Sequence, residues 1–451
     1  MNVAIIGGGI GGLSAALFLK LIFPTWTIQL YEGMGRFGGR IYTAMAKDSD
    51  GSTTFESGAG RIGLDHKYTM MLLKRYDLDK KLFPITNKID IKKGGIKDKE
   101  ASYGLKKSTQ SPTKTLENLV NKRIPKSEMD TSTIAELAEK YMPYEAPVIK
   151  YNFEYDSEIR VAKASTAIKT ILDIFRDKRG FAVLGGGLTQ LVDNLCEELK
   201  RLGVVLNTNH KIVNITPIPT KGRYRLTMNV QSGKSRTRIQ RTVDKVIITT
   251  NIHTIRQLMD PLISPPKFRM LYGENILTTQ PLLRVYARFP GTPESCWFAG
   301  LPKTATRMGI RYFIPIDTTK CLAMISYTDS LVAKAWKEVT DNFGEEAATE
   351  MILEQLQEIF PDRKIAKPKW VRYEYWTNGA HYWMPGRTPI EGDIEYQRMK
   401  PMERGRDREG KTGIYVGGEV TSPEYQAWVE GGVERSVKIV ETIYEEERRR
   451  D

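Results

Sequence analysis

Cysteine and histidine are both scarce in this chain of 451 residues. The three cysteines, Cys196, Cys296 and Cys321, are far apart and form no C-x-x-C pair, and only four histidines occur. This pattern excludes a disulfide framework and makes a zinc or other metal site unexpected. It also indicates a reducing, intracellular compartment.

Long apolar runs are missing as well. The best candidate, ALFLKLIF, carries Lys20 in its middle and is much shorter than the ~18 residues of a membrane span. The chain opens with MNVAIIGGG, directly in a predicted strand, which leaves no room for a signal peptide. We therefore expect a cytoplasmic protein without a membrane span, and the length predicts about two or three domains.

The charge balance is strongly positive, with a net charge of +14. Part of the excess lies in residues 86–126, the basic insert, which holds 11 basic and 4 acidic residues. Its portion 92–114 is poor in apolar residues and is predicted to be an exposed loop. A solvated surface is the simpler interpretation, because a basic run without interleaved aromatics is a weak sign of nucleic acid or of an acidic partner.

A strand, a glycine-rich turn and a helix open the chain. NVAII is followed by GGGIGG and then by LSAALFLKLIF, so that Gly7, Gly9 and Gly12 form G-x-G-x-x-G between a strand and a helix. In this setting the glycines permit a tight turn, close approach of a pyrophosphate and close helix packing. A second strand, WTIQLY, ends at Glu32, where a carboxylate would bind a ribose 2′-OH and repel a 2′-phosphate. These features predict a dinucleotide site and argue against NADP.

The residues after the second strand indicate which dinucleotide is bound. They read EGMGRFGGRIYT and resemble the flavin-containing amine oxidase family, which has an acid, R-x-G-G-R and then threonine at this place. The resemblance implies that Arg36 and Arg40 lie near the pyrophosphate and flavin side of FAD. Gly38 and Gly39 would let the backbone pass close to the ring.

Two later segments continue the resemblance in the same order. FAVLGGGLTQLVDNLCEEL, residues 181–199, is similar to the Gly-Gly turn and return helix of the family. The strand HKIVNITPI follows, and its Val213 matches a position whose backbone meets the adenine.

The C-terminal segment is similar to the flavin motif of the same family. It reads IYVGGEVTSPEYQAWVEGGVERSV, residues 414–437. By resemblance, Gly418 and Glu419 lie along the ribityl chain and pyrophosphate, and Trp428 faces the flavin. The helix that begins near Val429 would direct its N-terminus at the flavin O2 and stabilise negative charge there.

The resemblance covers nearly the whole chain and implies an α/β fold. A discontinuous, Rossmann-like FAD domain would comprise 1–85, 181–265 and 395–451. A mixed α+β substrate domain would comprise 86–180 and 266–394, including the basic insert and a helical block at 127–180. The pattern of AKAWKEVT…EEAATEMILEQLQEIF predicts a helical pair within it.

The family implies oxidation at a carbon that bears an amine, with hydride transfer to flavin N5 and reoxidation by O2 to hydrogen peroxide. In WTNGAHYWMPG, His381 occupies the position of an aromatic residue that would flank the amine together with Trp428, and a satisfied wall histidine without a role in proton transfer is the alternative. Ala380 stands where some members carry a flavin-bonded cysteine, so the FAD is expected to be non-covalent. Arg284 stands where the family has a lysine that holds a water beneath N5, which puts oxidase turnover in question.

The substrate depends on Arg61, in FESGAGRIGLDH. Polyamine oxidases tend to have an aromatic here, whereas L-amino acid oxidases have G-x-M-R-[IL]-P, in which the arginine holds the substrate carboxylate. This chain matches the arginine and the aliphatic residue but has Gly60 and Gly63 in place of methionine and proline. An L-amino acid is therefore the preferred substrate, with a primary amine or polyamine as the first alternative. A contact of Arg61 with FAD or Glu56 also remains open, as does a flavin-bearing binding protein with weak or lost oxidase activity.

Overall fold

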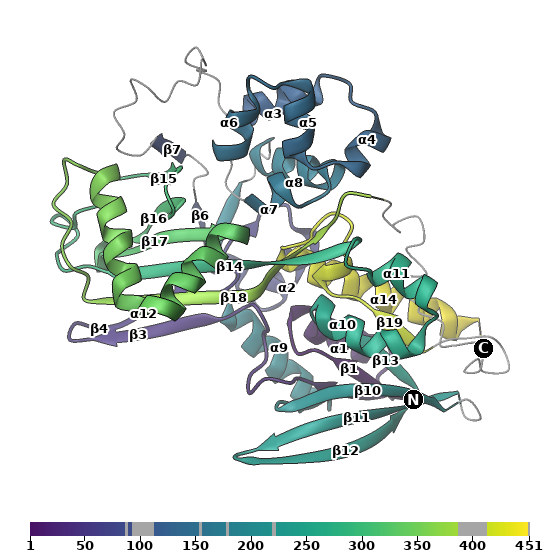
Figure 1. Ribbon diagram of the computed structural model, residues 1–451. Coiled ribbons are helices and arrows are strands. Elements are labelled where there is room, and N and C mark those ends of the chain that lie inside the picture. The colour runs from purple at the N-terminus through teal and green to yellow at the C-terminus, as the bar shows by residue number, and fades with distance from the viewer. Residues whose placement is uncertain are drawn as a thin grey trace.

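The structure of the protein is a computed structural model. It describes residues 1–85, 89–92, 112–152, 156–176, 180–218, 222–386 and 413–449. Helices and strands are mixed along the chain, as the α/β prediction requires, and they form four regions that are visible in Figure 1.

A five-stranded parallel sheet lies at the centre of the first region. Its strand order is β19-β13-β1-β2-β9, so segments from both ends of the chain meet in one sheet. The strands are β1 (Asn2–Ile6), β2 (Thr27–Tyr31), β9 (Val205–Asn207), β13 (Lys245–Ile248) and β19 (Ile414–Val416). Helices α1 (Ile10–Ile22), α9 (Thr189–Arg201) and α14 (Val429–Arg448) pack together beside it around a core of leucine, isoleucine and valine.

An antiparallel meander covers the other side of this sheet, at the bottom of Figure 1. Its strands are β10 (His210–Ile218), β11 (Arg223–Ser232) and β12 (Ser235–Val243). Helices α10 (Ile252–Met259) and α11 (Pro265–Tyr272) complete the second core between meander and sheet.

A six-stranded mixed sheet forms the third region, in the order β18-β14-β17-β16-β15-β7. The strands are β7 (Ile89–Lys92), β14 (Leu277–Arg288), β15 (Lys303–Thr306), β16 (Tyr312–Asp317), β17 (Leu322–Asp329) and β18 (Trp370–Trp383). Helix α12 (Ser330–Ile359) packs on it and is broken at Gly344, whose φ of 85° is non-helical. The predicted helical pair is thus present, with the glycine as its joint.

A block of short helices forms the fourth region, at the top of Figure 1. It contains α3 (Pro112–Val120), α4 (Lys126–Thr131), α5 (Ile134–Tyr141), α6 (Ala146–Asn152), α7 (Asp156–Arg160) and α8 (Ala164–Arg176). Between the regions lie the hairpin β3 (Thr43–Asp48) and β4 (Gly51–Glu56), helix α2 (Lys67–Arg75), and the small sheet of β5 (Ile62–Gly63), β8 (Phe181–Leu184) and β6 (Leu82–Ile85).

The basic insert is more ordered at its ends than the sequence predicted. Ile89–Lys92 is strand β7, paired with β15, and residues 112–120 are helix α3, in which Leu116 and Leu119 are fully buried. The loop prediction was therefore wrong for residues 112–114, where apolar contacts of α3 outweigh the local charge, and residues 93–111 lie outside the described part of the chain. Within the described ranges, no helix is both long and apolar enough to cross a membrane.

Candidate functional site

The first glycine turn closes tightly between β1 and α1. Gly7 has a φ of 109°, and its N–H donates to the Tyr31 carbonyl at 2.9 Å. A Cβ at Gly12 would lie 1.9 Å from the Gly7 oxygen, whereas a Cβ at Gly9 would meet no protein atom within 4 Å. Gly12 is thus required by packing, and Gly9 leaves open space beside the N-terminus of α1, where a phosphate group can approach.

Glu32 braces this turn from the end of β2. Its carboxylate accepts hydrogen bonds from the Gly8 N–H at 2.7 Å and from the Met34 N–H at 2.8 Å. The carboxylate is therefore fixed beside the glycine turn, and a contact with a ribose hydroxyl at this place stays a prediction.

The second glycine turn lies directly against the first. Gly38 donates its N–H to the Gly8 carbonyl at 2.8 Å, and a Cβ at Gly39 would be 3.3 Å from the Gly9 Cα. Arg36 curls back and donates to the Gly39 carbonyl at 2.8 Å and to two further carbonyls of its own turn. Burial lowers the pKa of Arg36. Its main contacts in the structure are thus with the backbone of the turn.

Glu419 is the centre of a charged cluster that joins three distant segments. Its carboxylate pairs with Arg40, accepts a hydrogen bond from Nδ1 of His381 at 2.5 Å, and accepts another from the Ala427 N–H at 2.9 Å. Arg40 also donates to the Gly379 carbonyl at 3.0 Å. We call Arg40, His381 and Glu419 the Glu419 cluster.

Burial and charge act in opposite directions in this cluster. Burial alone would raise the pKa of Glu419, but Arg40 and His381 outweigh it and hold the pKa at about 2. Burial lowers the pKa of His381 more than Glu419 raises it, so the imidazole is neutral at pH 7. Its Nε2 accepts the Ile252 N–H at 3.3 Å, which leaves the proton on Nδ1.

The contacts of His381 fit the second interpretation of this residue, a satisfied histidine of the cavity wall. The ring is fully buried, and both nitrogens are bonded inside the protein, so a place beside the substrate amine opposite Trp428 stays a prediction. The neighbouring carboxylate is the physical reason for this burial. A neutral imidazole donates one hydrogen bond to Glu419 and accepts one from the first N–H of α10. Ala380, the preceding residue, is also buried.

The C-terminal motif runs from Gly418 to the start of α14. Gly418 has a φ of 84°, and a Cβ there would lie 3.5 Å from the Thr249 oxygen. Ala427 has a φ of 65°, which is unfavourable for a residue with a side chain. The hydrogen bond from its N–H to Glu419 stabilises this conformation. Trp428 is the N-cap of α14, which begins at Val429 as predicted. The Glu419 cluster thus fixes the direction in which Trp428 leaves the turn.

Arg61 lies beside Trp428 in an aromatic cluster. Its Cζ is 5.4 Å from the centre of the Phe181 ring and 5.7 Å from that of Trp428. Phe181 and Trp428 stack with centres 5.5 Å apart, and His66 meets Trp428 edge-on at 5.2 Å. Strand β5 pairs with β8, with Gly63 opposite Phe181, which brings these residues together. We call Arg61, His66, Phe181 and Trp428 the Arg61 cluster.

Helices α14 and α2 are joined to each other next to the Arg61 cluster. Glu430, in the first turn of α14, accepts hydrogen bonds from the Tyr68 and Thr69 N–H groups at the start of α2. His66 needs space that only a glycine leaves, because a Cβ at Gly63 would lie 2.7 Å from its ring. This contact explains why glycine stands where the amino acid oxidase pattern has proline.

Arg284 clamps the segment that leads to Arg61. Its guanidinium donates to the carbonyls of Glu56, at 3.0 Å, and Gly58. Tyr286 donates to the same Glu56 carbonyl at 2.7 Å, and the Trp376 indole donates to the Ser57 carbonyl at 2.8 Å. Arg284 is thus a backbone clamp in the structure, and a role beneath the flavin stays a prediction.

Two predicted positions are explained by local backbone form. Val213 is the extra residue of a β-bulge between Ile212 and Asn214, so its backbone is outside the β10–β11 ladder. Gly60 leaves room for Glu56, since a Cβ at Gly60 would be 2.9 Å from the Glu56 Cβ. Burial raises the pKa of Glu56, whose carboxylate caps the Leu188 N–H.

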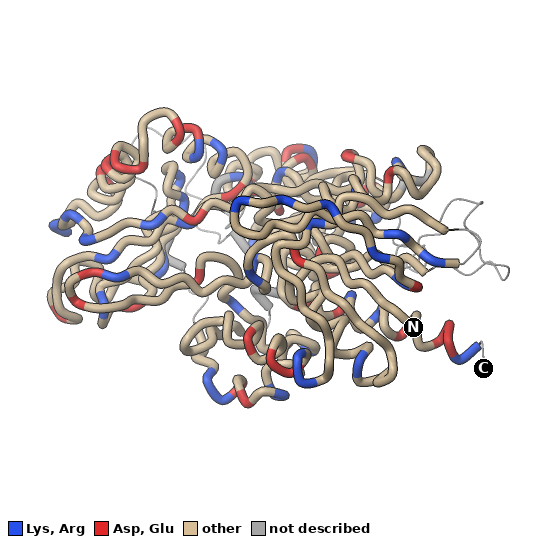
Figure 2. Tube along the Cα trace, turned by 90° about the horizontal axis from the view of Figure 1, so that it is seen from below, with Lys and Arg blue, Asp and Glu red and all other residues tan. Residues whose placement is uncertain are grey.

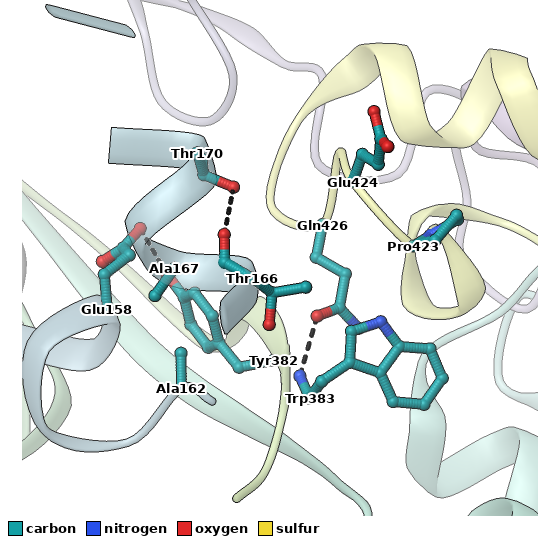
Figure 3. A pocket seen from close by; sticks show the side chains of 10 residues that line it. All are labelled: Glu158, Ala162, Thr166, Ala167, Thr170, Tyr382, Trp383, Pro423, Glu424 and Gln426. Atoms are coloured by element: carbon teal, nitrogen blue, oxygen red, sulfur yellow. Dashed lines mark hydrogen bonds between the residues drawn. The ribbon is translucent and has the colours of Figure 1, made fainter. Parts of the chain in front are cut away.

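A small cleft lies next to these clusters, between α7, α8 and the loop before Trp428 (Figure 3). Glu158 and Glu424 line its two sides, and the Tyr382 hydroxyl donates to Glu158 at 3.1 Å. Gln426 accepts the Trp383 N–H at 2.8 Å and closes one end. The cleft therefore has acidic side chains on both walls.

Sequence reasoning missed Phe181, the cleft carboxylates and the clamp around residues 56–58. Phe181 heads a strand that the sequence does show, but its partner strand β5 has only two residues, too short for a periodic signal. No group of three or more metal-ligating side chains gathers anywhere in the part of the chain that the structure describes.

With this geometry in place, comparison with known families gives a definite result. The model of the family described as flavin containing amine oxidoreductase matches residues 10–443. The chain belongs to this family. It is an FAD-dependent oxidoreductase.

Individual relatives of the flavin amine oxidoreductase are more distant. A protoporphyrinogen oxidase from Schizosaccharomyces pombe is 35% identical over 96 residues, which is 19% of this chain and 19% of the relative. A solved structure from Exiguobacterium sp. 255-15, assigned by name to protoporphyrinogen oxidase, is 18% identical with a TM-score of 0.68 and 99% coverage of both chains. A triple mutant of putrescine oxidase is 15% identical with a TM-score of 0.73 and 99% coverage of both chains. At these identities the solved structures show the fold alone.

The residues present fit FAD. The open side of Gly9, the free N–H groups of α1 and the adjoining Gly39 form a cradle without side chains for a pyrophosphate. The N-terminus of α14, reached after Trp428, supplies a second helix end that favours negative charge.

Proposed function

We propose that this enzyme oxidises a small molecule in which a carboxylate stands next to an amine, with an L-α-amino acid as the preferred substrate. The observation that carries the proposal is the position of Arg61 beside Trp428 and Phe181. A guanidinium binds a carboxylate through two parallel hydrogen bonds, and the two flat rings can pack against the substrate.

The backbone on both sides of Arg61 is also held in place. Arg284 and Trp376 fix the backbone of residues 56–58 before it, and Glu430 fixes the start of α2 after it. Pre-organised binding groups lose less entropy when the ligand arrives, so a rigid Arg61 supports carboxylate recognition.

When bound, FAD would supply a hydride acceptor at the site, and O2 would then take up its electrons to give hydrogen peroxide. The chain's own residues bind, orient and exclude water. We propose that Gly7, Gly9 and Gly12 admit the pyrophosphate and that Gly418 and Glu419 lie along the ribityl chain. The FAD would be non-covalent, since Ala380 offers no thiol.

Two variants test the carboxylate anchor. Arg61→Ala should lower kcat/KM for the best L-amino acid by about 30- to 1000-fold, which corresponds to a lost buried ion pair of roughly 2–4 kcal/mol. Arg61→Lys should recover part of that loss, because a point charge replaces the fork. Lys67→Ala, at an exposed cation nearby, serves as the control and should change little.

Peroxide release and anaerobic bleaching of the flavin are the measurements. Unchanged kinetics in Arg61→Ala would remove Arg61 from the site. Yellow protein that no amine or amino acid bleaches would instead support a flavin-bearing binding protein without oxidase activity. Protoporphyrinogen belongs in the screen, because the relative from Schizosaccharomyces pombe is named as its oxidase. Protoporphyrinogen also carries carboxylates that an arginine can bind.

The acidic cleft favours a diamine as the second candidate. Glu158 and Glu424 are suited to hold an ammonium group, and putrescine oxidase is among the proteins of the same fold. Activity on putrescine that falls in Glu158→Gln and Glu424→Gln, with no activity on any amino acid, would establish this candidate and reject the first.

A further inference from the structure

The meander sheet of β10, β11 and β12 carries charge of only one sign. Its three strands contain six basic residues and no aspartate or glutamate. All six are exposed: Lys211, Arg223, Arg225, Arg236, Arg238 and Arg241. Lys234, in the β11–β12 turn, is a seventh exposed cation. Figure 2 views the molecule from below Figure 1, the side on which the meander lies, and shows basic segments along the strands.

The strand register sorts these residues onto one face. Lys211, Asn229 and Arg238 lie in one row across the sheet, Thr216, Arg225 and Thr242 lie in a second, and Gln231 pairs with Arg236. The opposite face presents the apolar side chains of Tyr224, Leu226, Met228 and Val243 to the core. We call the outer side, with Lys211, Arg223, Arg225, Arg236 and Arg238, the basic sheet face.

Contacts within the protein account for little of this charge. Arg223 pairs with Asp244 at 2.7 Å. Arg225, Arg236 and Arg238 form no ion pair with any carboxylate in the described ranges. Protection of edge strands from unwanted pairing would explain the cations on β10 and β12, the two outer strands of the sheet, but not Arg223 and Arg225 on the central strand β11.

We propose that the basic sheet face docks the enzyme on an anionic phospholipid surface. Three strands present the cations on a nearly flat area, about 10 Å wide between the outer strands and about 30 Å long. A flat membrane can contact all of the cations at once. No apolar side chain projects from the centre of this face, so attachment is electrostatic, reversible and sensitive to salt.

Nucleic acid fits this face less well. The face has no aromatic side chain on which the bases of a single strand could stack. A three-stranded sheet is also wider than the two-stranded ribbon that enters the major groove of a duplex.

The test compares two triple variants of the FAD-loaded protein that lose the same charge. One replaces Arg225, Arg236 and Arg238 with glutamine on the basic sheet face. The control replaces Lys334, Lys364 and Lys367, exposed cations on α12 and the segment after it, with glutamine. Co-sedimentation is measured with vesicles of phosphatidylcholine alone and with vesicles that contain about one third phosphatidylserine.

Wild type and control should bind the phosphatidylserine vesicles at low salt and not the neutral ones. The arginine triple variant should bind roughly 100-fold more weakly, at about fivefold per cation, while it keeps its flavin and its activity. Failure of the wild type to bind, or an equal loss in both triple variants, would overturn the proposal. Arginine-dependent binding of duplex RNA or DNA without vesicle binding would assign the face to nucleic acid instead.

Discussion

Replacement of Glu419 by glutamine tests the Glu419 cluster, which joins Arg40, after the second glycine turn, to the C-terminal motif. The substitution keeps the shape of the side chain. It removes the negative charge that pairs with Arg40 and that accepts a hydrogen bond from Nδ1 of His381. Glu419 is buried, so water cannot replace these contacts. The cost should therefore be much larger than for a surface carboxylate.

The magnitude follows from the pKa of Glu419. In the folded protein the pKa is about 2, compared with an ordinary value of 4.5. A difference of about 2.5 pH units corresponds to roughly 3 kcal/mol in favour of the charged form in the folded state. We expect Glu419→Gln to lower the free energy of unfolding by about this amount at pH 7.

The pH dependence has a definite sign. Because the folded-state pKa lies below the unfolded one, the stabilisation by Glu419 is fully present above about pH 5. It is lost as the pH falls from 4.5 towards 2. The difference between wild type and variant should thus stay constant from pH 8 to 5 and then shrink by about 1.4 kcal/mol per pH unit.

Urea unfolding of the FAD-loaded protein, followed by tryptophan and flavin fluorescence, measures this difference. Glu441→Gln is the control, because Glu441 pairs with Lys438 at the surface and its replacement should change the stability by less than about 0.5 kcal/mol. A Glu419→Gln variant as stable as wild type at pH 7 would refute the view that Arg40 and His381 hold a buried carboxylate in its charged form.

Two further predictions concern the glycine turn and the backbone clamp. Gly9→Ala should change the stability of the apoprotein by less than about 1 kcal/mol but weaken FAD binding by about 10- to 100-fold, because the added methyl group would enter the proposed pyrophosphate cradle. Gly12→Ala should prevent folding, because its Cβ would lie 1.9 Å from the Gly7 oxygen. Flavin titration and urea unfolding separate the two effects, and equal FAD affinity of Gly9→Ala and wild type would place the cofactor elsewhere. Arg284→Lys should lower the unfolding free energy by about 1–2 kcal/mol, because lysine cannot span the two carbonyls that arginine bonds, and an unchanged urea midpoint would contradict the clamp.

Local sequence patterns predicted the nucleotide-binding region well. The strand–turn–helix around Gly7 lies where the glycine spacing and periodicity placed it, and the bounds of β10 and the start of α14 at Val429 lie where the resemblance to the family placed them. These features depend on residues a few positions apart. The glycine spacing indicates directly where the backbone turns tightly or packs too closely for a side chain. The same holds for α12, where Gly344 separates the two predicted helices.

The parts that the sequence did not predict depend on partners far along the chain. His381 is buried because Glu419, 38 residues later, accepts a hydrogen bond from its Nδ1–H. Phe181 meets Arg61 through the pairing of β8 with a two-residue strand. In the basic insert, the charged composition predicted a loop, whereas the structure buries Leu116 and Leu119 in helix α3.

The distribution of charge around Trp428 also bears on the choice between an amino acid and a diamine. The Arg61 guanidinium lies 5.7 Å from the centre of the Trp428 ring, so an ammonium group packed on the same face of that ring would lie within roughly 6 Å of a permanent cation. At an effective dielectric constant of about 20, two like charges at this separation repel by about 3 kcal/mol, or roughly 100-fold in affinity. Under the proposed function, a zwitterion would offset this repulsion, because its carboxylate would pair with Arg61. A diamine has no carboxylate to offset the repulsion from Arg61. Arg61→Leu should therefore weaken amino acid oxidation and strengthen diamine oxidation in the same peroxide assay.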